Sequence, residues 1–149
     1  MPRWLGIDPG EKRIGVAVGG TGVRIASPVG VVPAQPRRAA IDRIRAYAGE
    51  YGATGLVVGW PLNMDGTEGP QARQARALAA ELAGQTGLDV RLWDERLSSF
   101  AADQALAGLL TRDKRKARQD AVAAAAMLQE FLSSGGPETA PGPGDPRDE

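Results

Sequence analysis

The chain has 149 residues, a length that suits one ordinary domain, and its 18 Lys and Arg residues balance its 18 Asp and Glu residues. With 42% hydrophobic residues it is expected to fold as a globule. The absence of cysteine excludes disulfides, thiolate nucleophiles and cysteine-bound zinc, and the absence of histidine excludes Ser-His-Asp catalysis and histidine-bound metals. An enzyme of this composition has to use carboxylates, hydroxyls, Lys or Arg, and oxygen ligands favour Mg²⁺ or Mn²⁺.

The charge is unevenly distributed along the chain. Residues 133–149 hold four acids and one base, so residues 1–132 carry 17 bases against 14 acids, a net charge of +3 that permits a polyanionic partner. No apolar run approaches the length of about 18 residues that a membrane span needs. The strand pattern begins at Trp4, which leaves no room for a signal peptide, so we expect a cytoplasmic protein with no membrane partner.

The hydropathy pattern predicts nine elements. In chain order these are strands at 4–7, 14–18 and 23–26, a helix at about 37–51, a strand at 56–58, a helix ending near Gly84, a strand at 90–93, a helix from Ser98 or Ser99 to about Leu110, and a last helix that follows a basic segment at 112–118. The order βββαβαβαα is typical of an α/β fold, with one five-stranded mixed sheet and helices on both faces.

The last 17 residues differ in composition from the rest. Residues 133–149 contain four prolines and four glycines, which predicts a disordered, acidic tail after a single domain of residues 1–132. Trp4, Trp60 and Trp93 each border a predicted strand, and we expect them to pack in the core or at its rim.

Three carboxylates follow or open predicted elements. Asp8 ends the first strand, Glu95 follows the fifth strand, and Asp120 is predicted to open the last helix, where the helix dipole favours an acid. Each has a structural explanation as well, because Asp8 suits a turn with Pro9 and Gly10, Glu95 suits a surface position, and Asp120 suits a helix start. Their joint placement at element ends favours a functional site.

Four blocks of sequence resemble those of the YqgF/RuvX family, in the same order and across the whole predicted domain. The blocks are Leu5-Gly6-Ile7-Asp8-Pro9-Gly10 with the residues up to Ala17, Val58-Gly59-Trp60-Pro61-Leu62-Asn63-Met64-Asp65-Gly66-Thr67, Asp94-Glu95-Arg96-Leu97-Ser98, and Lys114-Arg115-Lys116 with Asp120-Ala121-Val122-Ala123-Ala124. Trp60 departs from the small or aliphatic residue usual in the family.

The resemblance implies an RNase H-like fold and a metal-dependent nuclease whose three acidic active-site residues map onto Asp8, Glu95 and Asp120. These three would bind one or two Mg²⁺ or Mn²⁺ ions and direct water in line at the phosphodiester, leaving a 5′-phosphate and a 3′-hydroxyl. Lys114 and Lys116 are candidates for protonating the leaving oxygen. The predicted nucleic-acid contacts are Lys12, Arg13, Asn63, Arg96, Ser98, Arg112, Lys114, Arg115, Lys116 and Arg118.

The resemblance implies two substrates, either the 5′ end of the small-subunit (16S) ribosomal RNA precursor, which we favour, or four-way DNA junctions of recombination and repair. A junction resolvase has to pair two sites in a homodimer, whereas RNA processing does not. The rival from another class is a non-catalytic module that binds nucleic acid. No phosphate-binding loop is present, and actin-like sugar kinases, which also have Asp-x-Gly after a strand, close two domains around a nucleotide.

Overall fold

Five strands form one sheet in the computed structural model, which describes residues 2–21, 26–97 and 112–144, with the backbone alone for residues 112–119. The strands are β1 (Arg3–Pro9), β2 (Arg13–Gly20), β3 (Ser27–Pro33), β4 (Gly55–Trp60) and β5 (Asp89–Asp94). Their order across the sheet is β3-β2-β1-β4-β5. Strand β2 is antiparallel to both of its neighbours, whereas β1, β4 and β5 run parallel, so the predicted mixed sheet is confirmed.

The third strand lies later in the chain than predicted. Ala26 is outside any strand and β3 runs over Ser27–Pro33, whereas Val23–Ile25 of the strand predicted at 23–26 lie outside the described residues. Two prolines are tolerated in β3 because it is an edge strand, with one side that needs no hydrogen-bond partner. The pairing of β3 with β2 shifts register between Val16 and Ala17, which is typical of a β-bulge.

Two helices cover one face of the sheet. Helix α1 (Arg37–Tyr51) has the predicted bounds and ends at Gly52, whose φ of 64° is left-handed. Helix α2 (Pro70–Thr86) begins at a proline and runs past the predicted end near Gly84, because the left-handed residue that terminates it is Gly87. A short 3-10 turn, η1 (Glu95–Leu97), follows β5, and the helix predicted from Ser98 or Ser99 to Leu110 falls outside the described residues.

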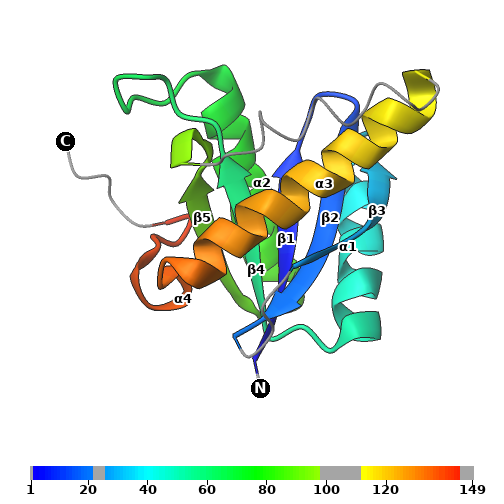
Figure 1. The fold of residues 1–149 in the computed structure, drawn as a ribbon, viewed down its shortest axis with the longest axis horizontal. Helices are drawn as coiled ribbons and strands as arrows, with labels where there is room; N and C mark the ends of the chain where they lie inside the picture. The colour runs from blue at the N-terminus through cyan, green and yellow to red at the C-terminus, as the bar shows by residue number, and fades with distance from the viewer. Residues whose placement is uncertain (1, 22–25, 98–111, 145–149) are drawn as a thin grey trace.

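The opposite face is crossed diagonally by the long helix α3 (Arg112–Ser133), as Figure 1 shows. The basic segment was predicted to precede this helix, but it forms the helix's first two turns, because residues 112–120 contain no glycine or proline that would interrupt a helix. Asp120 is therefore the ninth residue of α3 rather than its first. The prediction that Asp120 opens a helix is wrong, and the helix dipole does not explain its placement.

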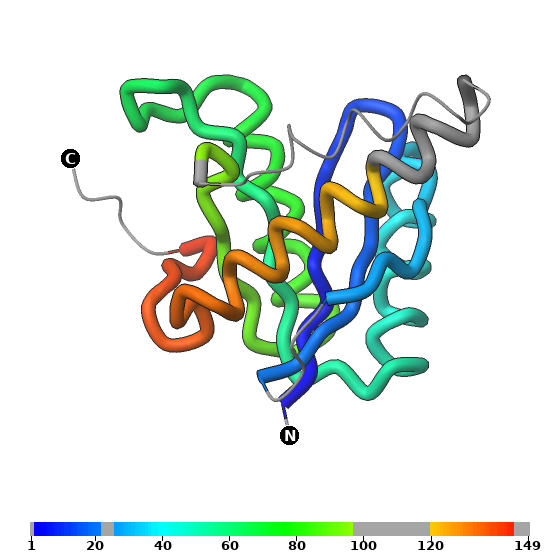
Figure 2. Tube along the Cα trace, viewed as in Figure 1, coloured from blue at the N-terminus to red at the C-terminus, as the bar shows by residue number. Residues whose placement is uncertain are grey.

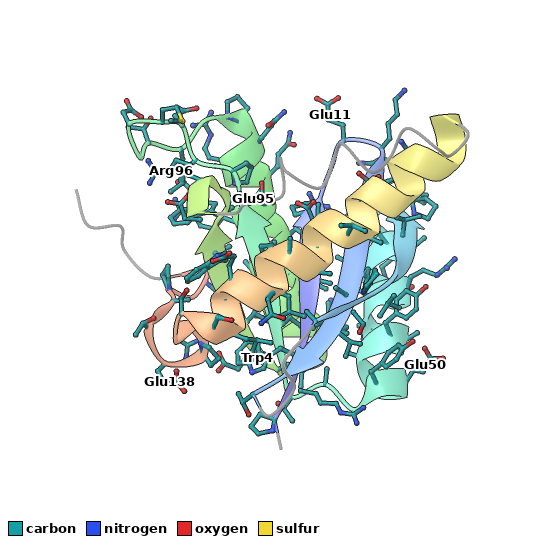
Figure 3. All side chains as sticks on the ribbon, viewed as in Figure 1. Trp4, Glu11, Glu50, Glu95, Arg96 and Glu138 are labelled. Carbon is teal, nitrogen blue, oxygen red and sulfur yellow. The ribbon has the colours of Figure 1, made fainter. Side chains whose placement is uncertain are left out.

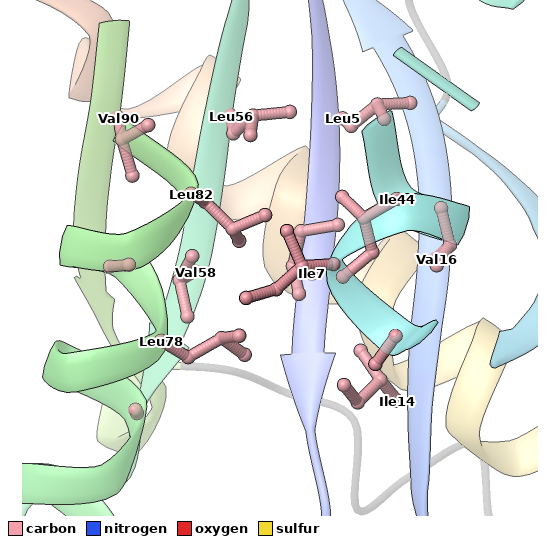
Figure 4. Close-up of a cluster of buried hydrophobic side chains, with 14 of the residues drawn as sticks. Leu5, Ile7, Ile14, Val16, Ile44, Leu56, Val58, Leu78, Leu82 and Val90 are labelled. Carbon is pink, nitrogen blue, oxygen red and sulfur yellow. The ribbon is translucent and has the colours of Figure 1, made fainter. Parts of the chain in front are cut away.

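Each face of the sheet has its own hydrophobic core. Leu5, Ile7 and Val58 pack with α1 and α2 in the larger cluster, which Figure 4 shows in close-up. The smaller cluster lies under α3, where Phe131 makes edge contacts with the rings of both Trp4 and Trp93. All three tryptophans are buried, as predicted. Among the helices that the structure describes, none is long and apolar enough to cross a membrane.

The composition of the tail predicts disorder from residue 133, whereas the described part of the tail contains a short helix and contacts the sheet. Helix α4 (Gly136–Thr139) turns the chain back, and the segment after it, drawn in red in Figure 2, lies beside β5. Ala140 is buried in the cluster beneath α3. The backbone N–H of Leu92 donates to the carbonyl of Pro141 at 2.8 Å, and Arg91 donates to the carbonyl of Ala140 at 2.7 Å.

Candidate active site

Asp8 projects from the end of β1 toward α3. Ile7 belongs to the core under α1 and α2, and side chains alternate along a strand, so Asp8 faces the other side. Its partner on β2 is Gly15, while Ile7 pairs with Val58 of β4, which brings Gly59 to the other flank of Asp8. The Asp8 carboxylate therefore has a glycine on each side.

Glu95 reaches back from the first residue of η1 over β4. A Cβ atom added at Gly59 would overlap Oε1 of Glu95, so the carboxylate occupies the space that a side chain at position 59 would fill. This places the carboxylates of Glu95 and Asp8 next to each other, at the carboxyl ends of two parallel strands. Figure 3 shows Glu95 at this end of the sheet.

Asp120 is brought to the same place from the middle of α3. A Cβ atom at Gly15 would overlap the backbone carbonyl of Asp120, so the absence of a side chain lets the helix approach β2 this closely. Nε of Arg13 on β2 donates to Oδ2 of Asp120 at 3.0 Å, and each side chain is about one-third exposed. Arg13, predicted to contact nucleic acid, is thus paired with a site acid.

The two neighbouring carboxyl groups have perturbed acidities. Burial, aided by hydrogen bonding to Asp8 and by the charges of Asp8 and Asp94, raises the pKa of Glu95 to about 10. Burial also raises the pKa of Asp8, and the charge of Asp120 adds to that rise, whereas the hydrogen bond with Glu95 opposes it. At neutral pH Glu95 therefore carries a proton, because two adjacent, partly buried carboxylates repel each other. A cation would substitute for that proton.

The donors at this site fit a hard divalent cation in kind, because all of them are carboxylate oxygens. Within the described parts of the chain, no three acidic side chains are arranged as a finished metal site. The third acid is turned to Arg13 instead. The structure thus brings Asp8 and Glu95 together, with Asp120 close enough to affect Asp8.

The other predicted nucleic-acid contacts are distributed around this centre. Lys12 is exposed beside the β1–β2 turn. Asn63 donates to the hydroxyl of Thr67 at 2.9 Å and so braces the loop after β4, while Arg96 donates to Asp94 and to the carbonyl of Met64. Ser98 lies outside the described residues. The same holds for the side chains of Arg112, Lys114, Arg115, Lys116 and Arg118.

Sequence reasoning missed the residues that position the acids. Gly15 and Gly59 make room for Asp120 and Glu95, and Asp94 both orients Arg96 and raises the pKa of Glu95. Glu68 accepts from Nε1 of Trp60 at 2.9 Å and is paired with Arg76. The only available signal was the presence of both glycines inside the blocks that resemble a family.

Known proteins resemble the chain in sequence and in fold. The family model described as "RuvX: Holliday junction resolvase" matches residues 2–134. A protein of Anaeromyxobacter sp. (strain Fw109-5) named "Putative pre-16S rRNA nuclease" is 48% identical over 132 residues, 87% of this chain and 96% of that protein. A relative from Acidiphilium cryptum with the same name is 45% identical over 131 residues, 87% of this chain and 83% of that protein.

Two solved structures share the architecture at low sequence identity. RuvC of T. thermophilus, in complex with a Holliday junction substrate, has a TM-score of 0.55 at 18% identity and covers 95% of this chain and 99% of its own. The fowlpox virus Holliday junction resolvase has a TM-score of 0.53 at 10% identity, with 89% and 99% covered. These likenesses show the fold, and the predicted RNase H-like α/β fold is confirmed.

Proposed function

The chain belongs to the RuvX family, as its four blocks predict, and we propose that it is a divalent-metal-dependent nuclease that hydrolyses phosphodiester bonds of structured nucleic acid. The observation that carries this proposal is the contact between the partly buried carboxyl groups of Asp8 and Glu95, which lie together at the carboxyl ends of the strands and have raised pKa values. Adjacent carboxyl groups with raised pKa values are typical of sites that bind a cation or transfer a proton.

The roles of the residues follow from this geometry. Asp8 and Glu95 would hold the cation through their carboxylate oxygens, Asp120 would supply a third carboxylate, and Arg13, which is paired with Asp120 in this structure, would contact a phosphate. When bound, one or two Mg²⁺ or Mn²⁺ ions neutralise phosphate charge and provide a nucleophile near neutral pH. Partial burial of Asp8 and Glu95 lowers the effective dielectric around them, which strengthens these interactions.

The substrate that we favour is the 5′ end of the 16S ribosomal RNA precursor, because relatives that are 42–48% identical carry the name of a pre-16S rRNA nuclease. The second candidate is the four-way DNA junction, which the description of the matching family model favours. A junction has two strands to cut symmetrically, so this second function requires a homodimer.

The test compares the wild type with Asp8→Asn on labelled four-way junctions and 5′-extended ribosomal RNA precursor, in Mg²⁺, Mn²⁺ or EDTA. Cleavage should require the metal and fall by more than about a hundredfold in Asp8→Asn, because a ligand is lost while the side-chain size is kept. Asp42→Asn, on the exposed face of α1, is the matched control and should cleave normally.

Each outcome of this test selects one function. Cleavage of the RNA alone supports precursor processing, and symmetric nicks in the junction support a dimeric resolvase. A folded Asp8→Asn protein with full activity would show that the assigned site is wrong. Binding of both nucleic acids by the wild type without any cleavage would instead support the non-catalytic module.

A further inference from the structure

A pocket of about 180 Å³ lies at the carboxyl ends of β1 and β4, on the face that α1 and α2 cover. Glu95 forms part of its wall, so the pocket adjoins the proposed cleavage site while extending away from α3. Drug-sized ligands occupy cavities of about 300–1,000 Å³. A pocket of this smaller volume suits a single ring system.

Part of the pocket wall is apolar. Ile14 and Leu78, both members of the core under α1 and α2, form part of the lining, and Pro9 and Pro61 contribute two more apolar rings. Surfaces of this kind bind the faces of a planar ring, as enzymes do when they hold a base that has left its stack.

Three glutamines complete the lining. Gln35 lies just before α1, and Gln71 and Gln74 lie on the first turns of α2. Each amide can donate and accept hydrogen bonds, and all three residues are exposed, so their amides are accessible to a ligand as well as to water. Such groups complement the edge of a nucleobase, which also alternates donors and acceptors.

The charges of the lining select against a phosphate. Glu11 and Glu95 contribute acidic groups, and the Arg37 guanidinium that borders the pocket donates to Glu81 at 2.7 Å. A phosphate here would meet two carboxyl groups and an arginine that is already paired, whereas a neutral ring would meet no repulsion.

We propose that this pocket receives one unstacked nucleobase of the substrate, next to the phosphodiester that is cleaved. The proposal rests on the proposed nuclease function, because Glu95 is shared between the pocket and the cleavage site. Single-stranded ends and branch points of nucleic acids supply bases that can leave their stack at low cost. The pocket would therefore select where along a strand the enzyme cuts.

The experiment measures 2-aminopurine fluorescence in EDTA, where metal-dependent cleavage cannot occur. The base analogue is placed at successive positions of the 5′ extension of the ribosomal RNA precursor and around the centre of the four-way junction. The proteins are the wild type, the double variant Gln71→Ala/Gln74→Ala, and Gln85→Ala, an exposed glutamine of α2 outside the pocket. Fluorescence anisotropy reports binding, and thermal unfolding checks that the variants fold.

We expect a severalfold rise in fluorescence at one position with the wild type and Gln85→Ala, and loss of that rise in the double variant. If nucleic acid binds but no position brightens, or if the double variant brightens it equally, the pocket proposal is overturned while the nuclease proposal stands. If the fluorescence rise is lost in the double variant but the wild type cleaves neither nucleic acid in Mg²⁺ or Mn²⁺, the nuclease proposal fails alone. Absence of binding to both nucleic acids overturns both proposals.

Discussion

Gly59 of β4 leaves the space in which the side chain of Glu95, a proposed metal ligand, lies. The carboxylate of Glu95 lies where the Cβ atom of any other residue at position 59 would be. The obstructing group is the end of a flexible side chain, so an added methyl group should displace Glu95 rather than disrupt the sheet. Gly15 differs, because its Cβ atom would meet the backbone of α3 at Asp120.

We predict that Gly59→Ala folds normally but binds Mn²⁺ about 10- to 100-fold more weakly and loses cleavage activity by a similar factor, because Glu95 is moved away from Asp8. Adding Glu95→Asp should partly restore both quantities, since the shorter side chain leaves room for the methyl group. Mn²⁺ titration and the midpoint of thermal unfolding separate this effect from a loss of folding.

A matched control is Gly49→Ala, because a Cβ atom at this position of α1 contacts nothing within 4 Å. This variant should bind Mn²⁺ as the wild type does. If Gly59→Ala binds and cleaves normally, Gly59 has no positioning role. A double variant less active than either single variant would also contradict the steric explanation.

For single residues, the sequence indicates that Asp8 and Glu95 lie close together, but not which neighbouring residues position the acids. Asp8 and Glu95 could be predicted to meet because both follow parallel strands, whose carboxyl ends share one edge of the sheet. The pairing of Arg13 with Asp120 joins residues 107 positions apart, and no local pattern indicates it. For the same reason Arg13 was predicted only as a phosphate contact.

At the scale of elements, the end of the chain stabilises the side of the sheet that carries α3. Helix α4 returns the chain so that Ala140 is buried and Pro141 accepts a hydrogen bond from Leu92 of β5. Gly136 packs directly against the ring of Phe131, the largest fully buried side chain of the described core. Residues 135–141 are thus part of the domain.

We predict that a chain ending at Ser134 is less stable than the full chain by about 2–4 kcal/mol, since two hydrogen bonds and the cover over Phe131 are removed. A chain that ends at Gly144 keeps these interactions and should unfold as the full chain does. Urea denaturation of the three proteins measures the difference. Equal stability of the chain ending at Ser134 would show that α4 contributes nothing to the domain.

Helix α1 and the tail differ in how well the sequence predicts them, and the difference has a physical reason. Helix α1 could be predicted to the residue because its apolar positions repeat at helical spacing and Gly52 follows them. The composition of the tail, which is poor in apolar residues, predicts disorder, yet Ala140 is buried and two hydrogen bonds join Ala140 and Pro141 to β5. Composition reports the average of a segment and not its individual contacts.

At the scale of the whole molecule, the net charge is zero, but one run of bases directly precedes a site acid in the chain. The carboxylates meet at one end of the sheet, and the five bases between Arg112 and Arg118 occupy the first two turns of α3, just before Asp120. A polyanion whose phosphodiester lies at Asp8 would extend along neighbouring surface, and the start of α3 is the basic element closest in sequence to the site. Phosphates bound there should dominate the dependence of affinity on salt.

We predict that the triple variant Lys114→Gln/Arg115→Gln/Lys116→Gln binds nucleic acid more weakly and with a shallower salt dependence, by about 0.7–0.9 in log–log slope for each phosphate that the protein no longer neutralises. The charge-matched control is Arg38→Gln/Arg43→Gln/Arg45→Gln on α1, across the sheet from α3. Anisotropy titrations between about 50 and 200 mM NaCl give both slopes. Equal changes in the two variants would mean that only net charge matters, whereas a change confined to the α3 variant would identify the start of α3 as the surface along which the substrate strand lies.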